Sequence, residues 1–120
     1  MKVTVAMDET HDVDEVVVVR LPREIDMTNT KVVTRDLLAA RAPGVRVIVA
    51  DLTSTTFCDS AGIRALAQAH QQTARSNVGL RLAVAPGGAV HRVMEIMDLA
   101  TVLAIYPTVE AAVAGSSGSR

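Results

Sequence analysis

A serine and an aspartate lie side by side where a predicted strand leads into a predicted helix. The apolar run from Val45 to Leu52 is typical of a strand that is buried on both faces. A helix follows, and its predicted inner face consists of Ile63, Leu66, Ala67, His70 and Ala74. Asp59 and Ser60 stand at the start of this helix. Because functional groups in open α/β sheets collect beyond the carboxyl ends of strands, this junction is the candidate site.

The Asp59–Ser60 pair has two chemical interpretations. Either side chain could cap the helix by accepting a hydrogen bond from its free N–H groups, which is the commoner use of these residue types. Alternatively, Ser60 is phosphorylated, since a phosphate at a helix N-terminus meets free N–H donors and the positive end of the helix dipole.

The charge of a phosphate at Ser60 is large enough to switch a protein complex. Phosphoserine carries about −1.5 to −2 charges. A unit-charge pair at about 4 Å and an effective dielectric of 20 is worth about 4 kcal/mol. Half of that energy, left after screening, weakens binding by more than about tenfold. Phosphorylation would therefore weaken the binding of a partner protein without changing the fold of the domain.

Catalytic and metal-binding interpretations have less support. Asp26 and Asp59 have no second ligand at helical spacing, so caps and turn carboxylates are preferred. A serine-histidine-aspartate triad has no pattern behind it, because no G-x-S-x-G elbow is present and the histidines are scattered. These histidines are His11, His70 and His91. The segment Pro86–Ala89 lacks the lysine and the glycine spacing of a phosphate-binding loop and is explained as a turn.

Other polar groups near the junction rank below Ser60. Cys58 has no neighbouring base, and the adjacent carboxylate of Asp59 opposes thiolate formation, so an inert packed thiol is predicted. The hydroxyls of Thr53, Thr55 and Thr56 belong to a polar turn after the strand.

Composition limits the classes of partner. The net charge is −1 and aromatic residues make up only 2%, Phe57 and Tyr106, so neither electrostatic attraction nor stacking favours nucleic acid. A single cysteine fits a reducing cytoplasm, and no apolar run reaches the length of a membrane span. We expect a soluble cytoplasmic protein without a leader. The tail from Gly115 to Arg120 is predicted to be a flexible native end or a cloning remnant.

Hydrophobic periodicity places the elements that must position the junction. Strands are predicted over residues 3–6, 16–19, 45–52, 80–85 and 103–106. The first two strands form a hairpin across the charged segment Asp8–Glu15. The first helix begins near Thr28 or Asn29, either of which could cap it, and buries Val33, Leu37 and Leu38 before Pro43 and Gly44. After the second helix, Asn77 and Gly79 form a C-terminal cap, and a third helix buries Val90, Val93, Met94 and Met97. A fourth helix runs to Ala114.

This order predicts one α/β domain over residues 1–114. Strands that alternate with helices imply parallel pairing and right-handed crossovers, after an antiparallel pair at the start. The expected architecture is a small mixed, mostly parallel sheet covered by about four helices.

Three segments together resemble a known family. Asp51–Thr53 followed by Thr56–Ile63 resembles the central signature of the STAS family, in particular of bacterial anti-sigma factor antagonists. Leu21–Asp26 is similar to the family's earlier strand-end motif, and Met94–Leu103 to its late helix. The resemblance covers most of residues 1–114 and implies a STAS domain.

The resemblance also implies a function. Ser60 would be phosphorylated by a partner anti-sigma factor that is itself a serine kinase and binds the ATP; this protein would need no cofactor. The unphosphorylated antagonist would bind the anti-sigma factor and release a sigma factor, and a phosphatase would reset the switch. The protein would be no enzyme, would not contact nucleic acid or insert into a membrane, and would be a monomer or weak dimer. The expected partner-binding residues are Asp26, Thr53, Ser54, Thr55, Thr56, Asp59, Ser60, Ala61, Gly62 and Arg64, with Gln68 and Gln71 beside them.

The sequence departs from the family pattern at two positions. Arg23 stands where many relatives have glycine, which places a cation beside the expected contact surface. Ala61 replaces a second serine of some members and so removes a rival phosphorylation site. Two other hypotheses stay open: a constitutive STAS subunit of a membrane transport complex, in which Ser60 is only a cap, and a small hydrolase that uses Ser60.

Overall fold

The computed structural model describes residues 2–6, 15–99 and 102–115. The strands are β1 (Lys2–Ala6), β2 (Glu15–Arg20), β3 (Glu24–Ile25), β4 (Val45–Asp51), β5 (Phe57–Cys58), β6 (Gly79–Ala83) and β7 (Ala104–Tyr106). The helices are α1 (Thr30–Ala39), α2 (Ser60–Arg75), α3 (Ala89–Ile96) and α4 (Val109–Ala114). The predicted segment Asp8–Glu15 lies outside the described residues except for Glu15, as does the predicted tail beyond Gly115.

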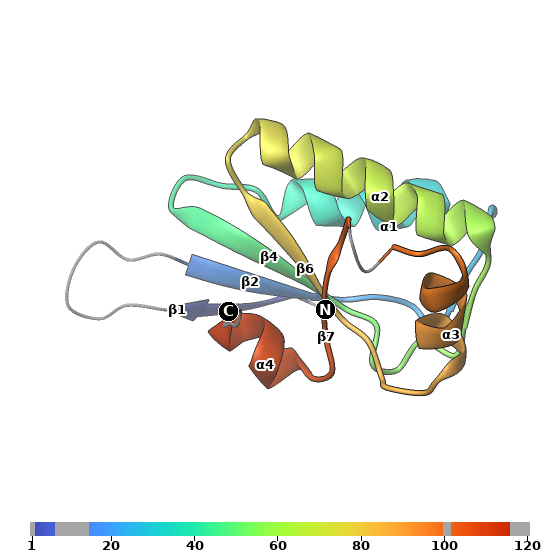
Figure 1. Ribbon diagram of the computed structural model, residues 1–120. Coiled ribbons are helices and arrows are strands. Elements are labelled where there is room, and N and C mark those ends of the chain that lie inside the picture. Colours follow the sequence, from blue (N-terminus) through green and yellow to red (C-terminus); the bar gives the residue numbers. More distant parts are fainter. Residues whose placement is uncertain (1, 7–14, 100–101, 116–120) are drawn as a thin grey trace.

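The main sheet has the predicted mixed topology. Its five strands lie in the order β1-β2-β4-β6-β7, and only β1 runs antiparallel to its neighbour. Helices α1 and α2 cover one face of the sheet and α4 covers the other, while α3 lies near the end of the sheet (Figure 1). The sequence therefore predicted the fold class and the antiparallel start correctly.

The central strand β4 is buried on both faces, as its apolar run indicates. Ile48 and Ala50 pack into the larger core beneath α1 and α2. Val47 and Val49 point the other way and pack with Ala112 of α4. Successive side chains of a strand alternate between faces, so a strand between two layers of helices must be apolar at nearly every position.

The predicted inner face of α2 is partly wrong. Ile63 and Leu66 are buried, but Ala67 and His70 are only half-buried and Ala74 is exposed. The buried positions are Gly62, Ile63, Ala65, Leu66, Ala69 and Thr73. The helix thus turns a row of small residues toward the sheet, and the one polar member satisfies its hydroxyl by donating to the His70 carbonyl oxygen at 3.1 Å.

One helix cap and the burial of two further side chains also differ from the predictions. Asn77 does adopt a left-handed conformation with φ 59°, but Gly79 opens β6 instead of capping α2. Met97 stands at the C-cap of α3 and is exposed rather than buried. Leu38 is only half-buried, whereas Val33 and Leu37 carry the buried stripe of α1.

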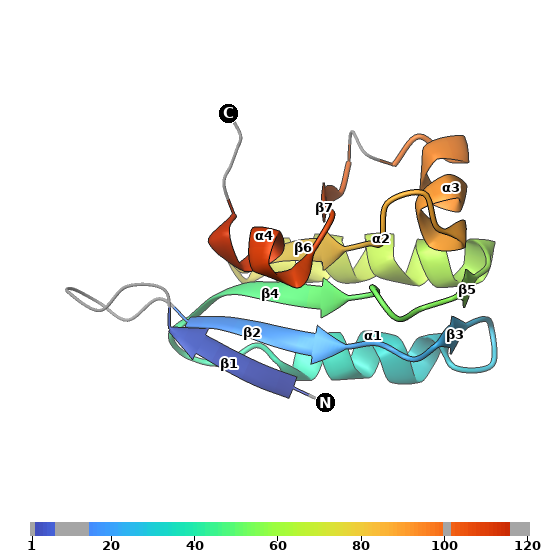
Figure 2. The same ribbon diagram turned by 90° about the horizontal axis from the view of Figure 1, so that it is seen from below.

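Two short strands were not predicted, and they organise the end of the sheet that carries the candidate site. β3 and β5 pair in parallel as a separate two-stranded sheet, with Ile25 opposite Cys58. They lie beyond the ends toward which β2 and β4 point, and α1 and α2 both begin on that side (Figure 2). Within the described ranges, no helix has the length and apolar character needed to cross a lipid bilayer.

Candidate functional site

The junction of β5 and α2 separates the two roles that the sequence left open for Asp59 and Ser60. Asp59 is the N-cap of α2, and its carboxylate accepts a hydrogen bond from the Gly62 N–H at 2.9 Å. Ser60 is the first residue of the helix and is exposed. Its hydroxyl forms no hydrogen bond with any residue that the structure describes. The cap is therefore Asp59, and the Ser60 hydroxyl is available to solvent.

The β3–β5 pair brings Asp26 next to this junction. The Asp59 N–H donates to the Ile25 carbonyl oxygen at 3.2 Å, which continues the pairing beyond β5. Asp26 directly follows β3 and Asp59 directly follows β5, so the two carboxylates stand at neighbouring strand ends. Both side chains are half-buried. The site thus combines a free hydroxyl with two carboxylates from distant parts of the chain.

Asp26 is held by its own turn. Its carboxylate accepts hydrogen bonds from the Thr28 hydroxyl at 2.5 Å and from the Thr28 N–H at 2.9 Å. These two bonds stabilise the charged form and lower the pKa of Asp26 below its usual value. Asn29 occupies the N-cap position of α1, as predicted, but it does not cap the helix. Its side chain instead accepts from the Asp26 N–H at 3.0 Å and donates to the Glu24 carbonyl oxygen at 2.8 Å, which braces the turn.

Three threonine hydroxyls of the turn between β4 and β5 donate hydrogen bonds within the domain. Thr53 donates through its hydroxyl and its N–H to the Asp51 carboxylate, at 2.6 and 2.9 Å. The Thr56 hydroxyl donates to the Arg23 carbonyl oxygen at 3.2 Å. Thr53, Ser54 and Thr56 nevertheless remain exposed. They belong to the segment between β4 and β5, and β5 leads directly into Asp59 and Ser60.

Two of the predicted contact residues are buried. Thr55 is only 7% exposed, and its hydroxyl donates to the Pro22 carbonyl oxygen at 2.7 Å. Gly62 lies on the buried side of α2, where an added Cβ would come within 2.7 Å of the Cys58 sulfur and 2.8 Å of an Ile25 methyl carbon. Both residues pack inside the domain beneath the site, so they offer little surface to a partner.

Cys58 behaves as the sequence predicts. It is a buried free thiol, and burial, aided by the nearby Asp59 charge, raises its pKa to about 11.

Among the described residues, no cluster of three or more His, Cys, Asp or Glu side chains is arranged to hold a metal ion. His70 and His91 lie on different helices, and the His91 Nδ1 accepts from the Gly87 N–H at 3.3 Å. Neither of these two histidines forms a hydrogen bond with Ser60, and His11 lies outside the described residues.

Two exposed apolar side chains near the site were missed by sequence reasoning. Phe57, the only phenylalanine of the chain, is 49% exposed in β5, and Met27 is 77% exposed directly after Asp26. The signal for them was weak, since an isolated apolar residue in a turn is common on protein surfaces. Their position beside the carboxylates makes them candidate contacts of a partner protein.

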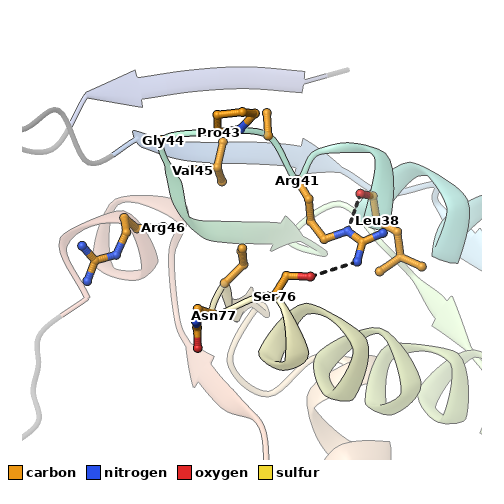
Figure 3. A pocket seen from close by; sticks show the side chains of 10 residues that line it. Leu38, Arg41, Pro43, Gly44, Val45, Arg46, Ser76 and Asn77 are labelled. Atoms are coloured by element: carbon orange, nitrogen blue, oxygen red, sulfur yellow. Dashed lines mark hydrogen bonds between the residues drawn. The ribbon is translucent and has the colours of Figure 1, made fainter.

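A pocket of about 880 Å³ lies away from the candidate site, at the start of β4 and the C-terminal ends of α1 and α2. Figure 3 shows Arg41 at its wall, where its guanidinium donates to the Leu38 carbonyl oxygen at 2.9 Å and to the Ser76 hydroxyl at 3.2 Å. Those bonds tie the ends of the two helices together. We therefore interpret the pocket as part of the packing between the C-terminal ends of α1 and α2.

Comparisons with known proteins agree with this architecture. The model of the STAS domain family matches residues 5–112, so the chain belongs to the STAS domain family. A comparison with curated proteins gives no match.

Among solved structures, the chain is similar to an anti-sigma factor antagonist from Mycobacterium paratuberculosis. The identity is 23%, the TM-score is 0.71, and the alignment covers 94% of this chain and 92% of the other. The NMR structure of the protein TM1081 is similar at 19% identity and a TM-score of 0.64, covering 81% of this chain and 78% of the other.

The same fold occurs inside a much larger membrane protein. The murine Solute Carrier 26 family member A9 anion transporter matches at 16% identity and a TM-score of 0.67, covering 93% of this chain but only 21% of the transporter. At these identities the neighbours establish the shared fold, and function depends on the site itself.

Proposed function

We propose that this protein is an anti-sigma factor antagonist that binds an anti-sigma factor while Ser60 is unmodified and releases it when Ser60 is phosphorylated. One observation carries the proposal: Asp59 caps α2, which leaves the neighbouring Ser60 hydroxyl exposed and unbonded within the described residues. The similarity to the mycobacterial antagonist supports the class of partner. In this proposal the protein acts by binding and catalyses no reaction.

The start of α2 can accommodate a phosphate. The first N–H that bonds within the helix is that of Ile63, which donates to the Asp59 carbonyl oxygen at 3.0 Å. Of the three N–H groups before it, only that of Gly62 is taken by the Asp59 side chain. The N–H groups of Ser60 and Ala61 therefore remain for a phosphate, and the helix dipole adds a favourable field. The fold should survive the modification.

A partner would experience the modification differently. The phosphate would add about −1.5 to −2 charges next to the Asp26 and Asp59 carboxylates. With about 4 kcal/mol for a unit-charge pair at 4 Å and an effective dielectric of 20, half of that energy after screening weakens binding by about thirtyfold. The contact surface would comprise the exposed or half-buried residues of the site: Met27, Asp26, Thr53, Ser54, Thr56, Phe57, Asp59, Ser60, Ala61 and Arg64.

The partner would supply the remaining chemistry. We infer a cytoplasmic cycle in which the anti-sigma factor is a serine kinase that holds ATP and transfers its terminal phosphoryl group to the Ser60 hydroxyl, and a phosphatase restores the free serine. A sigma factor would be released when the unmodified antagonist occupies the anti-sigma factor. The antagonist itself would act as a monomer or weak dimer.

The test is a pulldown from the native cell with and without ATP, followed by mass spectrometry. We expect the wild-type protein to capture a kinase, to lose it when ATP is present, and to gain one phosphate at Ser60. Ser60→Ala should keep the kinase in both conditions. Ser76→Ala is the matched control, because this exposed serine lies at the opposite end of α2, outside the proposed contact surface, and should change neither result. A phosphate found only at another residue would overturn the assignment.

A second candidate function has support from the anion transporter that contains the same fold. In it, the protein is a constitutive subunit of a membrane transport complex, and Ser60 has no regulatory role. Copurification with a permease or its ATPase, unchanged by Ser60→Asp, would favour this function over the phosphorylation switch.

A further inference from the structure

A groove of about 510 Å³ runs between the N-terminal halves of α1 and α2, directly beside the residue that follows Ser60. Its lining consists of Thr30, Lys31, Thr34, Arg35, Ala61, Arg64, Ala65 and Gln68. Both helices begin at the end of the sheet that carries β3 and β5 (Figure 2). The positive ends of the two helix dipoles therefore lie at the same end of the groove.

The side chains of the groove add to this positive field. Lys31, Arg35 and Arg64 are exposed, and none of the described residues that line the groove is acidic. Arg35 has a carboxylate partner, Asp36, at 3.7 Å, but that pair is exposed at 72% and 53% and is weak. Lys31 and Arg64 form no ion pair with any residue that the structure describes. In a chain of net charge −1, this is a local concentration of unneutralised cations.

The shape and charge of the groove define its occupant. From Ala61 to Gln68 the wall of α2 rises by about 10 Å, which corresponds to two turns of a helix. The small side chains of Ala61 and Ala65 leave room for a close approach, and the three cations of the lining are exposed. We propose that the groove receives an acidic two-turn segment of the partner protein, and that a phosphate on Ser60 closes it by pairing with Arg64.

Closure follows from helical spacing and rests on the proposed phosphorylation of Ser60. Ser60 and Arg64 are four residues apart on α2 and both are exposed, so their Cβ atoms are separated by about 5–6 Å on one face of the helix. A guanidinium binds phosphate oxygens in a bidentate manner, which would remove Arg64 from the groove. The phosphate would also reduce the groove's charge from that of three cations to about one. Phosphorylation would thus compete with the acidic segment for the same arginine.

The docking part is tested on the isolated protein with a hexaglutamate peptide and a hexalysine control. We expect the glutamate peptide to shift the backbone NMR signals of residues 30–35 and 61–68, and hexalysine to leave them unchanged. The double variant Lys31→Gln with Arg64→Gln should raise the dissociation constant by about three- to thirtyfold. Arg75→Gln is the matched control, since it removes an exposed cation of the same helix outside the groove and should change the constant less than about twofold.

The closure part is tested with phosphoserine incorporated at position 60 during synthesis, so that it needs no kinase. Phosphorus NMR should give a phosphate pKa that is lower in this protein than in its Arg64→Gln variant by about 0.3 of a pH unit or more, with Arg75→Gln unchanged. The phosphorylated protein should also lose the hexaglutamate shifts.

Each outcome has a distinct meaning. Peptide-induced signal shifts elsewhere on the protein, or equal effects of Arg64→Gln and Arg75→Gln, would refute the proposed docking of an acidic segment in the groove. Binding of phosphatidylglycerol vesicles at the groove without binding of the peptide would refute it as well. If cellular Ser60 is phosphorylated and the kinase is released, but Arg64→Gln binds the kinase as Arg75→Gln does, only the groove fails. If Ser60 is never phosphorylated in the cell but the peptide binds in the groove, the proposed switch fails and the acidic docking site stands.

Discussion

Replacing Gly62 with alanine tests whether close packing beneath α2 holds the site together. The new Cβ would lie 2.7 Å from the Cys58 sulfur, 2.8 Å from an Ile25 methyl carbon and 3.2 Å from the Ile25 carbonyl oxygen. These atoms belong to β5 and β3, whose pairing places Asp59 beside Asp26. The substitution therefore strains the contact that joins the two carboxylates to the helix.

The magnitude follows from two opposing effects. Overpacking a well-filled core costs about 1–3 kcal/mol, whereas alanine in a helix is favoured over glycine by about 0.5–1 kcal/mol. We expect a net loss of about 1–2 kcal/mol in the free energy of unfolding. For a domain of this size that loss lowers Tm by about 4–8 °C.

Urea unfolding followed by circular dichroism measures the change, with Gly79→Ala as the matched control. At Gly79 an added Cβ would meet only ordinary contacts at 3.8 Å, so this variant should be neutral or slightly stabilised. The Cys58→Ala variant removes the nearest atom, so in combination with Gly62→Ala it should recover part of the loss as a positive coupling. A Gly62→Ala protein as stable as the Gly79→Ala protein, or one without coupling to position 58, would refute the packing argument.

The remaining predictions concern the cap, the carboxylate and the thiol. Asp59→Ala should lower the free energy of unfolding by about 1 kcal/mol in urea titrations, because the Gly62 N–H loses its acceptor, while Asp59→Asn should keep most of the stability. The pKa of Asp26 is lowered, so its contribution to stability is present above the pKa of the unfolded chain and is lost as the pH falls through the lower pKa of the folded protein. In Thr28→Val, which removes the hydroxyl donor, the carboxyl titration of Asp26 followed by NMR should move to higher pH. Cys58, with its pKa raised to about 11, should react with iodoacetamide at pH 8 far more slowly in the folded protein than in urea, and equal rates would contradict its burial.

The order of strands and helices was readable because long elements have a hydrophobic period. The β-branched run of β2 and the continuous apolar run of β4 each specify a buried strand, and the mixed sheet follows from their alternation with helices. The sequence predicted less well which side chains of each helix are buried. The buried side of α2 includes Ala69 and Thr73 instead of Ala67 and Ala74. Both pairs fit a helical spacing and all four residues are small, so the packing of the helix, and not its sequence pattern, decides which pair is buried.

The sequence by itself determined that a serine and an aspartate stand at the start of a helix after a central strand, because periodicity and turn chemistry are local properties. Only the tertiary structure decided which of the two caps the helix, and that Asp26 joins them. The β3–β5 pairing consists of two-residue strands, which have no period to detect and form through hydrogen bonds between distant segments. The cationic groove likewise exists only where α1 and α2 pack together, because the side chains that line it come from separate helices and share no sequence pattern.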